Sequence, residues 1–149
     1  VYAVGDVTGG LLLAHRASAQ GRALANHLFG DGELFYDEKA VPSVVYTHPG
    51  LARVGLTEKE ARARGMDAEI RRAEYGANMT ARTELMGNGF VKVLLSSGKV
   101  CGVTIVGEGA SELVAAAGLA MTGEMAERDL RKWVLPHPSL GELLGLFAP

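Results

Sequence analysis

The residue types best suited to acid–base chemistry are His137 and Glu142, which lie five positions apart near the end of the chain. Pro136 and Pro138 flank the histidine, and proline restricts both its own backbone and that of the residue before it. An imidazole titrates near neutrality, and a carboxylate bonded to one ring nitrogen fixes which nitrogen can accept a proton. The spacing therefore predicts a histidine base that is oriented by a glutamate.

The same stretch can also be interpreted as the start of a helix. Ser139 and Glu142 have the spacing of a capping box, in which the glutamate side chain returns to the serine backbone. A short helix would then run from Leu140 to Phe147 and the histidine would be incidental. The spacing alone leaves both interpretations open.

The composition is that of a globular protein with a hydrophobic core. The chain has 149 residues, of which 48% are hydrophobic, and a net charge of -2. Its 15 basic residues are balanced by 17 acidic ones, which argues against a nucleic-acid partner. No apolar run approaches the roughly 20 residues that cross a bilayer, and no leader sequence is visible. We therefore expect no membrane partner and a cytoplasmic location.

The one cysteine and the other histidines form no metal or redox motif. Cys101 lies in a β-type run, so we expect a small buried apolar residue and, with no second cysteine, no disulfide or dithiol centre. His15, His27 and His48 have neither the spacing nor the cysteine partners of a metal site. We expect no bound metal, with His15 at a helix start, His27 on a helix surface and His48 in a loop.

Hydrophobic periodicity divides the chain into a short N-terminal piece and a longer α+β part. Residues 1–30 are predicted to form a strand, a glycine turn and a helix that ends at Gly30, followed by a charged connector at 31–40. Beyond it, strands are predicted at 43–47, 52–55, 68–75, 90–95 and 100–106. Helices are predicted at 57–64, beginning with a capping box of Thr57 and Glu60, at 111–122 and at 127–132, and residues 78–85 are predicted to be helical or irregular. The simplest fold for this order is an antiparallel sheet with helices on one face. Because the chain begins with a strand that has no earlier partner, we expect a piece of a longer polypeptide.

Three segments, in this order, resemble the C-terminal part of the flavin disulfide reductases, and among these the dihydrolipoamide dehydrogenases most. They are Tyr2–Val7 with the downstream Leu13-Ala14-His15, then Pro42–Pro49, then His137–Glu142. No single motif is decisive, but the shared order and spacing are specific. The resemblance covers essentially the whole chain.

The resemblance implies that residues 1–30 are the C-terminal end of an FAD-binding domain, that residues 31–40 are a connector, and that residues 41–149 form the interface domain of a homodimer. It further implies that Asp6 binds the ribityl hydroxyls of FAD and that the helix start at Leu13, Ala14 and His15 faces the flavin. A helix N-terminus suits this role, because its unpaired N–H groups and positive partial charge favour negative charge on the ring.

For the acid–base pair, the resemblance implies that His137 acts at the flavin and redox disulfide of the other subunit. There it would deprotonate a dithiol substrate while Glu142 holds the imidazole, and its bond to Pro138 would be cis. The implied reaction is oxidation of the dihydrolipoyl groups of an acyltransferase complex with FAD as cofactor and NAD as acceptor. The family usually has threonine and serine where Ser139 and Gly141 stand.

Other features leave alternatives open. The sequence has no Gly-x-Gly-x-x-Gly nucleotide motif and no Cys-x4-Cys pair, so we expect NAD to bind elsewhere in the enzyme and these residues alone to be inactive. A glutathione-type, mercuric or quinone-reducing flavin reductase is an alternative, although the tail from Leu146 to Pro149 lacks the paired cysteines of the mercuric enzymes. A stand-alone dimerisation module without catalysis is another.

Overall fold

The computed structural model describes residues 1–147, and the chain divides into two compact units, Val1–Val41 and Pro42–Pro149. Residues 148–149 lie outside the described residues. They are the last residues of the predicted interface domain and of the tail that lacks cysteines. The assignment of residues 1–30 to a flavin domain stays a prediction.

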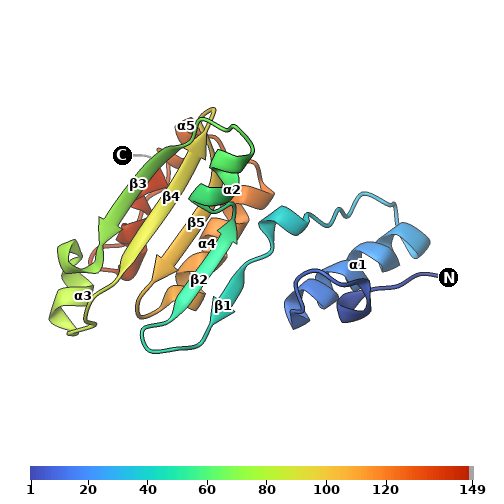
Figure 1. Cartoon of the computed structure of the whole chain (residues 1–149), viewed down its shortest axis with the longest axis horizontal. Coiled ribbons are helices and arrows are strands. Elements are labelled where there is room, and N and C mark those ends of the chain that lie inside the picture. Colours follow the sequence, from blue (N-terminus) through green and yellow to red (C-terminus); the bar gives the residue numbers. More distant parts are fainter. Residues whose placement is uncertain (148–149) are drawn as a thin grey trace. The chain divides into compact units, whose positions relative to one another are not determined.

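The first unit consists of a 3-10 turn, η1 (Gly5–Thr8), packed against the helix α1 (Ala14–Phe29) (Figure 1). The Gly5 N–H donates to the Gln20 side chain at 2.7 Å. A Cβ at Gly5 would lie 3.2 Å from that of Ala17, and the φ of +76° also favours glycine. The strand predicted at the start of the chain is wrong, because Val4 is extended but residues 1–4 pair with no other strand.

The predicted connector is attached to α1 through Arg16, whose side chain is buried. Its guanidinium donates to the Tyr36 hydroxyl and to the Leu11 carbonyl, both at 3.2 Å, and pairs with Glu38 at 3.3 Å. Glu38 begins the 3-10 turn η2 (Glu38–Ala40). The segment before α1 and the segment after it are thus held by one side chain.

The second unit is built on a five-stranded antiparallel sheet, as the sequence predicts. Its strands follow the spatial order β1 (Ser43–Val45), β2 (Leu51–Gly55), β5 (Lys99–Val106), β4 (Phe90–Ser96) and β3 (Glu69–Glu74). The central β4–β5 hairpin turns at Ser97 and Gly98, which both have positive φ. The α+β class is confirmed.

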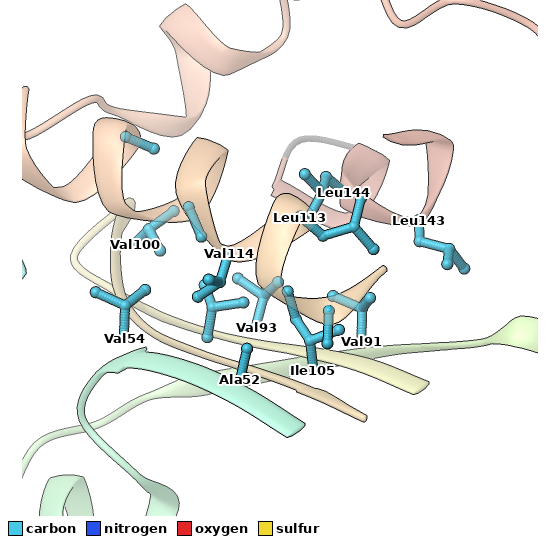
Figure 2. Packing of buried hydrophobic residues seen from close by; sticks show 14 of the residues in the cluster. Ala52, Val54, Val91, Val93, Val100, Ile105, Leu113, Val114, Leu143 and Leu144 are labelled. Carbon is cyan, nitrogen blue, oxygen red and sulfur yellow. The ribbon is translucent and has the colours of Figure 1, made fainter. Parts of the chain in front are cut away.

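The core lies between one face of this sheet and the helices α4 (Ala110–Thr122) and η4 (Leu140–Phe147). Figure 2 shows Leu113 and Val114 of α4 above Val93 and Ile105 of the sheet, with Leu144 of η4 beside them. Alternate residues of a strand face this layer, and in β4 these include Val91 and Val93.

Shorter helices complete the unit: α2 (Glu58–Ala63), η3 (Tyr75–Ala77), α3 (Met79–Thr83) and α5 (Glu127–Leu130). The predicted capping box of α2 is present, with Thr57 and Glu60 bonded to each other's backbone. Glu58 of α2 pairs with Lys92, which alternates with the core-facing residues of β4, so α2 lies over the opposite sheet face. Of the described residues, 1–147, no helix is long and apolar enough to cross a membrane.

Tyr75 fixes the turn that follows β3. Its side chain is fully buried, its hydroxyl donates to the Glu108 carbonyl at 2.6 Å, and its backbone N–H donates to the Gly89 carbonyl at 2.9 Å. Burial raises the pKa of Tyr75 to about 12. A Cβ on Gly107 would lie 2.4 Å from the ring, so glycine is required for this close approach. The chain leaving β3 therefore starts from a rigid point.

We expect Ile105→Ala to destabilise the protein by about 2–5 kcal/mol, because it opens a cavity in a fully buried site. Ile70→Ala is the matched control, since Ile70 is 47% exposed on β3 and should cost less than about 1 kcal/mol. Urea unfolding of both variants measures the difference. Equal losses of stability in the two variants would contradict the assignment of Ile105 to the core.

Candidate active site

His137 and Glu142 form the pair that the sequence predicts. The His137 Nδ1 lies 2.8 Å from the Glu142 Oε1, and the peptide bond to Pro138 is cis, as predicted. Because a carboxylate only accepts hydrogen bonds, Nδ1 carries the proton and Nε2 is left as the basic atom. The His137 side chain is 63% exposed, so a group from outside the chain can reach it.

The second oxygen of Glu142 has its own partner, the Ser139 backbone. Glu142 Oε2 accepts the Ser139 N–H at 3.0 Å, which is half of the predicted capping box. The Ser139 hydroxyl instead donates to the Pro136 carbonyl at 2.6 Å. One carboxylate thus satisfies both predicted interpretations, holding the imidazole with one oxygen and the helix start with the other.

These contacts keep Glu142 ionised. The pKa of its carboxyl group is lowered first by the Ser139 N–H and second by the hydrogen bond to His137. The carboxylate therefore remains charged at neutral pH, where it can stabilise an imidazolium on His137.

Arg71 of β3 binds the two helical elements that flank the segment carrying His137. This segment lies between α5 and η4, and Arg71 donates to Glu127 at the start of α5 and to the Leu146 carbonyl of η4, each at 3.2 Å. The Glu69 carboxylate binds the same guanidinium. No local pattern in the sequence marks this role, because the partners lie 56 and 75 positions away.

An open cavity of about 320 Å³ lies beside the pair. His137, Glu142 and Leu143 line it from the C-terminal segment, and Asn78 and Met79 line it from the start of α3. Asn78 was also missed by sequence reasoning, since an asparagine before a short helix is most simply a cap. The cavity gives the pair a surface on which a small substrate group can approach.

The four predicted flavin-binding residues, Asp6, Leu13, Ala14 and His15, all lie in the first unit. Asp6 is exposed in η1, Leu13 precedes α1, and Ala14 and His15 form its first turn. The N-cap residue Leu13 makes no side-chain cap hydrogen bond, and no acidic residue lies in the first turn. The positive partial charge of a helix N-terminus favours a cofactor that carries negative charge, so these residues are compatible with FAD.

The other candidates take no part in this site. Cys101 is half-buried, and burial raises the pKa of its thiol, which keeps it protonated. His48 is exposed, with its Nδ1 3.7 Å from Glu108, and His27 lies on the surface of α1. Within residues 1–147, no group of three histidine, cysteine or acidic side chains could hold a metal ion.

Comparison with protein families identifies the second unit. Residues 41–146 match the family described as "Pyridine nucleotide-disulphide oxidoreductase, dimerisation domain".

Curated relatives agree with this match. The chain is 38% identical over 144 residues to the mitochondrial dihydrolipoyl dehydrogenase of Caenorhabditis elegans and 37% identical to that of Mus musculus. These alignments cover 95% of the chain but only 29% and 28% of the two relatives. The chain thus spans less than a third of the length of these enzymes.

Solved structures are similar over nearly the whole chain. The crystal structure of LpdA from Mycobacterium tuberculosis matches with a TM-score of 0.88 and 32% identity, covering 96% of this chain and 32% of that one. The HOCl-induced flavoprotein disulfide reductase RclA from Escherichia coli matches with a TM-score of 0.85 and 30% identity, covering 98% and 34%. Flavoprotein disulfide reductases therefore share this fold.

We expect Arg71→Met to destabilise the protein by about 2 kcal/mol, because hydrogen bonds that involve a charged group are worth roughly 1.5–3 kcal/mol each. Arg72→Met is the matched control: Arg72 is half-exposed, pairs with Glu74 and should cost less than about 1 kcal/mol. Amide hydrogen exchange should accelerate in residues 131–139 only in the Arg71 variant. Unchanged exchange there would exclude Arg71 as the anchor of this segment.

We also expect the carboxyl group of Glu142 to titrate below its ordinary pKa in the His137→Ala variant, because the Ser139 N–H is the larger cause of the lowered value. A pKa that is lower in the folded protein stabilises the fold above the unfolded value, and this contribution is lost as the pH falls through the folded pKa. Carboxyl carbon NMR across the acid range measures the midpoint. A return of the Glu142 pKa to its ordinary value in the variant would mean that His137, and not the Ser139 N–H, is the main cause of the lowered pKa.

Proposed function

The chain belongs to the pyridine nucleotide-disulphide oxidoreductase family, and from this premise we propose that it is the C-terminal part of a dihydrolipoamide dehydrogenase. The proposed reaction is oxidation of a dithiol carrier with FAD as cofactor and NAD+ as acceptor. The observation that carries the proposal is the 2.8 Å contact between His137 and Glu142, which leaves the imidazole Nε2 as an exposed base.

In this reaction His137 moves the proton of the substrate. A thiolate, not a thiol, attacks a disulfide, and a free thiol titrates above neutral pH, so a base must take its proton. His137 Nε2 accepts this proton, and the resulting imidazolium is stabilised by the Glu142 carboxylate on Nδ1. The two prolines and the bond from Ser139 to Glu142 keep the ring oriented as the charge forms.

The first unit would contribute to the flavin site. FAD, when bound, supplies the two-electron transfer between the dithiol and the nicotinamide. Asp6 would bind its ribityl hydroxyls, and the N–H groups at Leu13, Ala14 and His15 would face the ring. The positive partial charge at the start of α1, where no acidic residue lies in the first turn, supports this assignment. NAD would bind mainly to other parts of the enzyme.

We further propose that the protein acts as a cytoplasmic homodimer that serves the dihydrolipoyl groups of an acyltransferase complex. The matched family is named as a dimerisation domain, which supports an interface formed by residues 41–149. The exposed imidazole of His137 supports an acid–base pair that is completed by the other subunit.

A second candidate function is reduction or oxidation of another disulfide substrate within the same family. The similarity to a flavoprotein disulfide reductase of Escherichia coli, at 30% identity, supports this alternative. Both functions use the same fold and the same pair of residues. The two functions differ in the dithiol that reaches His137, and a substrate profile separates them.

We expect His137→Gln to lower dihydrolipoamide-dependent NAD+ reduction by about 10²-fold or more in the native polypeptide that contains these residues, the scale for losing a positioned acid–base group. His27→Gln is the matched control, because His27 is exposed on α1 and outside the site. Steady-state rates at equal FAD content measure the effect.

Three results would contradict the proposal. Unchanged activity in the His137 variant would reduce this residue to part of the helix start. An active native protein that prefers unrelated dithiols to dihydrolipoamide would favour the second candidate function, and an inactive native polypeptide with the mass of this chain would favour a stand-alone dimerisation module.

A further inference from the structure

Asn78 is one of two polar or charged residues that are buried among the described residues, 1–147. It is only 7% exposed, and a buried amide is costly unless its polar atoms are paired. Its Oδ1 accepts the Ala81 N–H at 3.0 Å, which caps α3. Its Nδ2 donates to the Ser139 carbonyl at 2.9 Å, across 61 positions of sequence. Capping α3 uses only the side-chain oxygen of Asn78, so the hydrogen bond from its Nδ2 has another role.

From these contacts we propose that Asn78 is a positioning residue for the His137–Glu142 pair. It touches neither side chain through a hydrogen bond and acts through the Ser139 peptide. The inference rests on the proposed function for its catalytic meaning, but the orientation of the ring can be measured without any activity.

The Ser139 backbone connects Asn78 to the imidazole. Its carbonyl accepts from Asn78, and its N–H donates to Glu142, whose other oxygen binds His137. The Ser139 hydroxyl, bonded to the Pro136 carbonyl, restrains the chain on the other side of the histidine. If Ser139 turns, the direction of its N–H changes, and the Glu142 carboxylate must follow or lose a partner.

Asn78 can do this work because its own backbone is fixed to the core. It directly follows the turn η3, and its N–H donates to the Tyr75 carbonyl at 2.9 Å. Tyr75 is fully buried and bonded to Glu108. The connection thus runs from the core through Tyr75, Asn78, Ser139 and Glu142 to an imidazole that is 63% exposed.

Two substitutions separate positioning from capping. Asn78→Ser and Asn78→Asp both keep a side-chain oxygen that can cap α3, because serine and aspartate cap about as well as asparagine. Neither can donate to the Ser139 carbonyl, since serine is too short and an ionised carboxylate only accepts. Their side effects differ, because serine leaves unfilled space and aspartate adds a negative charge. Asn88→Asp, at an exposed site, controls for the added charge.

The readout is the tautomer of His137 in the whole chain, measured by ring nitrogen NMR near pH 8.5, where an ordinary imidazole is neutral. We expect the fraction with the proton on Nδ1 to fall about twofold or more in both Asn78 variants, because losing one neutral hydrogen bond shifts a local equilibrium by a factor of about five. The pKa of Glu142 should rise toward its ordinary value. Asn88→Asp should change neither.

An unchanged tautomer in either variant, with its fold intact by circular dichroism, would overturn the proposal and leave Asn78 as a helix cap. If both variants fail to fold, the test is made on the unaltered chain. Its Asn78 side-chain amide protons must then be protected from exchange and must show nuclear Overhauser contacts to Ser139. If they show neither, the proposal is overturned.

Activity of the native polypeptide separates this inference from the proposed function. We expect kcat for dihydrolipoamide oxidation to fall about tenfold in the Asn78 variants, because a displaced catalytic group costs rate. If His137→Gln leaves the activity unchanged, the proposed function fails, whereas the NMR result still decides whether Asn78 positions the pair.

Discussion

Glu142 accepts two hydrogen bonds from one segment of chain, and the candidate site depends on this division of its carboxylate. One oxygen holds the His137 ring and the other holds the Ser139 N–H, at 2.8 and 3.0 Å. A carboxylate with a single partner could rotate with the ring, but a second bond to the backbone fixes its plane. The same contacts lower its pKa, so the orientation of the imidazole and the charge that would stabilise its protonated form have a common origin.

The sheet contributes fixed points for an otherwise exposed segment. The side chain of His137 and its flanking residues have little apolar contact of their own, so their position must come from bonds to buried structure. Arg71 on β3 supplies two such bonds to the flanking elements α5 and η4, and Asn78 supplies one to Ser139, the last residue of the segment. Arg71 lies on β3 and Asn78 directly follows the turn after β3, and Tyr75 fixes this turn in the core. The antiparallel sheet is therefore part of the site although it carries no reacting group.

The sequence predicted the parts of this structure that depend on local patterns. Runs of β-forming residues predicted the strands, the Thr57–Glu60 capping box predicted α2, and the spacing of His137 and Glu142 predicted the pair. It failed where a contact or partner is distant in sequence. The strand expected at residues 1–5 does not form among the described residues, because a strand needs a neighbour. Arg71 and Asn78 were missed because nothing near them in sequence marks what they bind.

The two kinds of anchor suit the two environments that they occupy. Arg71 has a side chain 14% exposed and shares its charge among Glu69, Glu127 and a carbonyl, so its ionic bonds are partly solvated. Asn78 is more deeply buried and connects two backbone groups without any net charge, which avoids the cost of burying an ion. A cationic anchor next to Ser139 would also compete with His137 for the Glu142 carboxylate. A neutral amide fixes the geometry of the pair while leaving Glu142 as the charge that its imidazole contacts, and this is the property that an acid–base pair requires of its support.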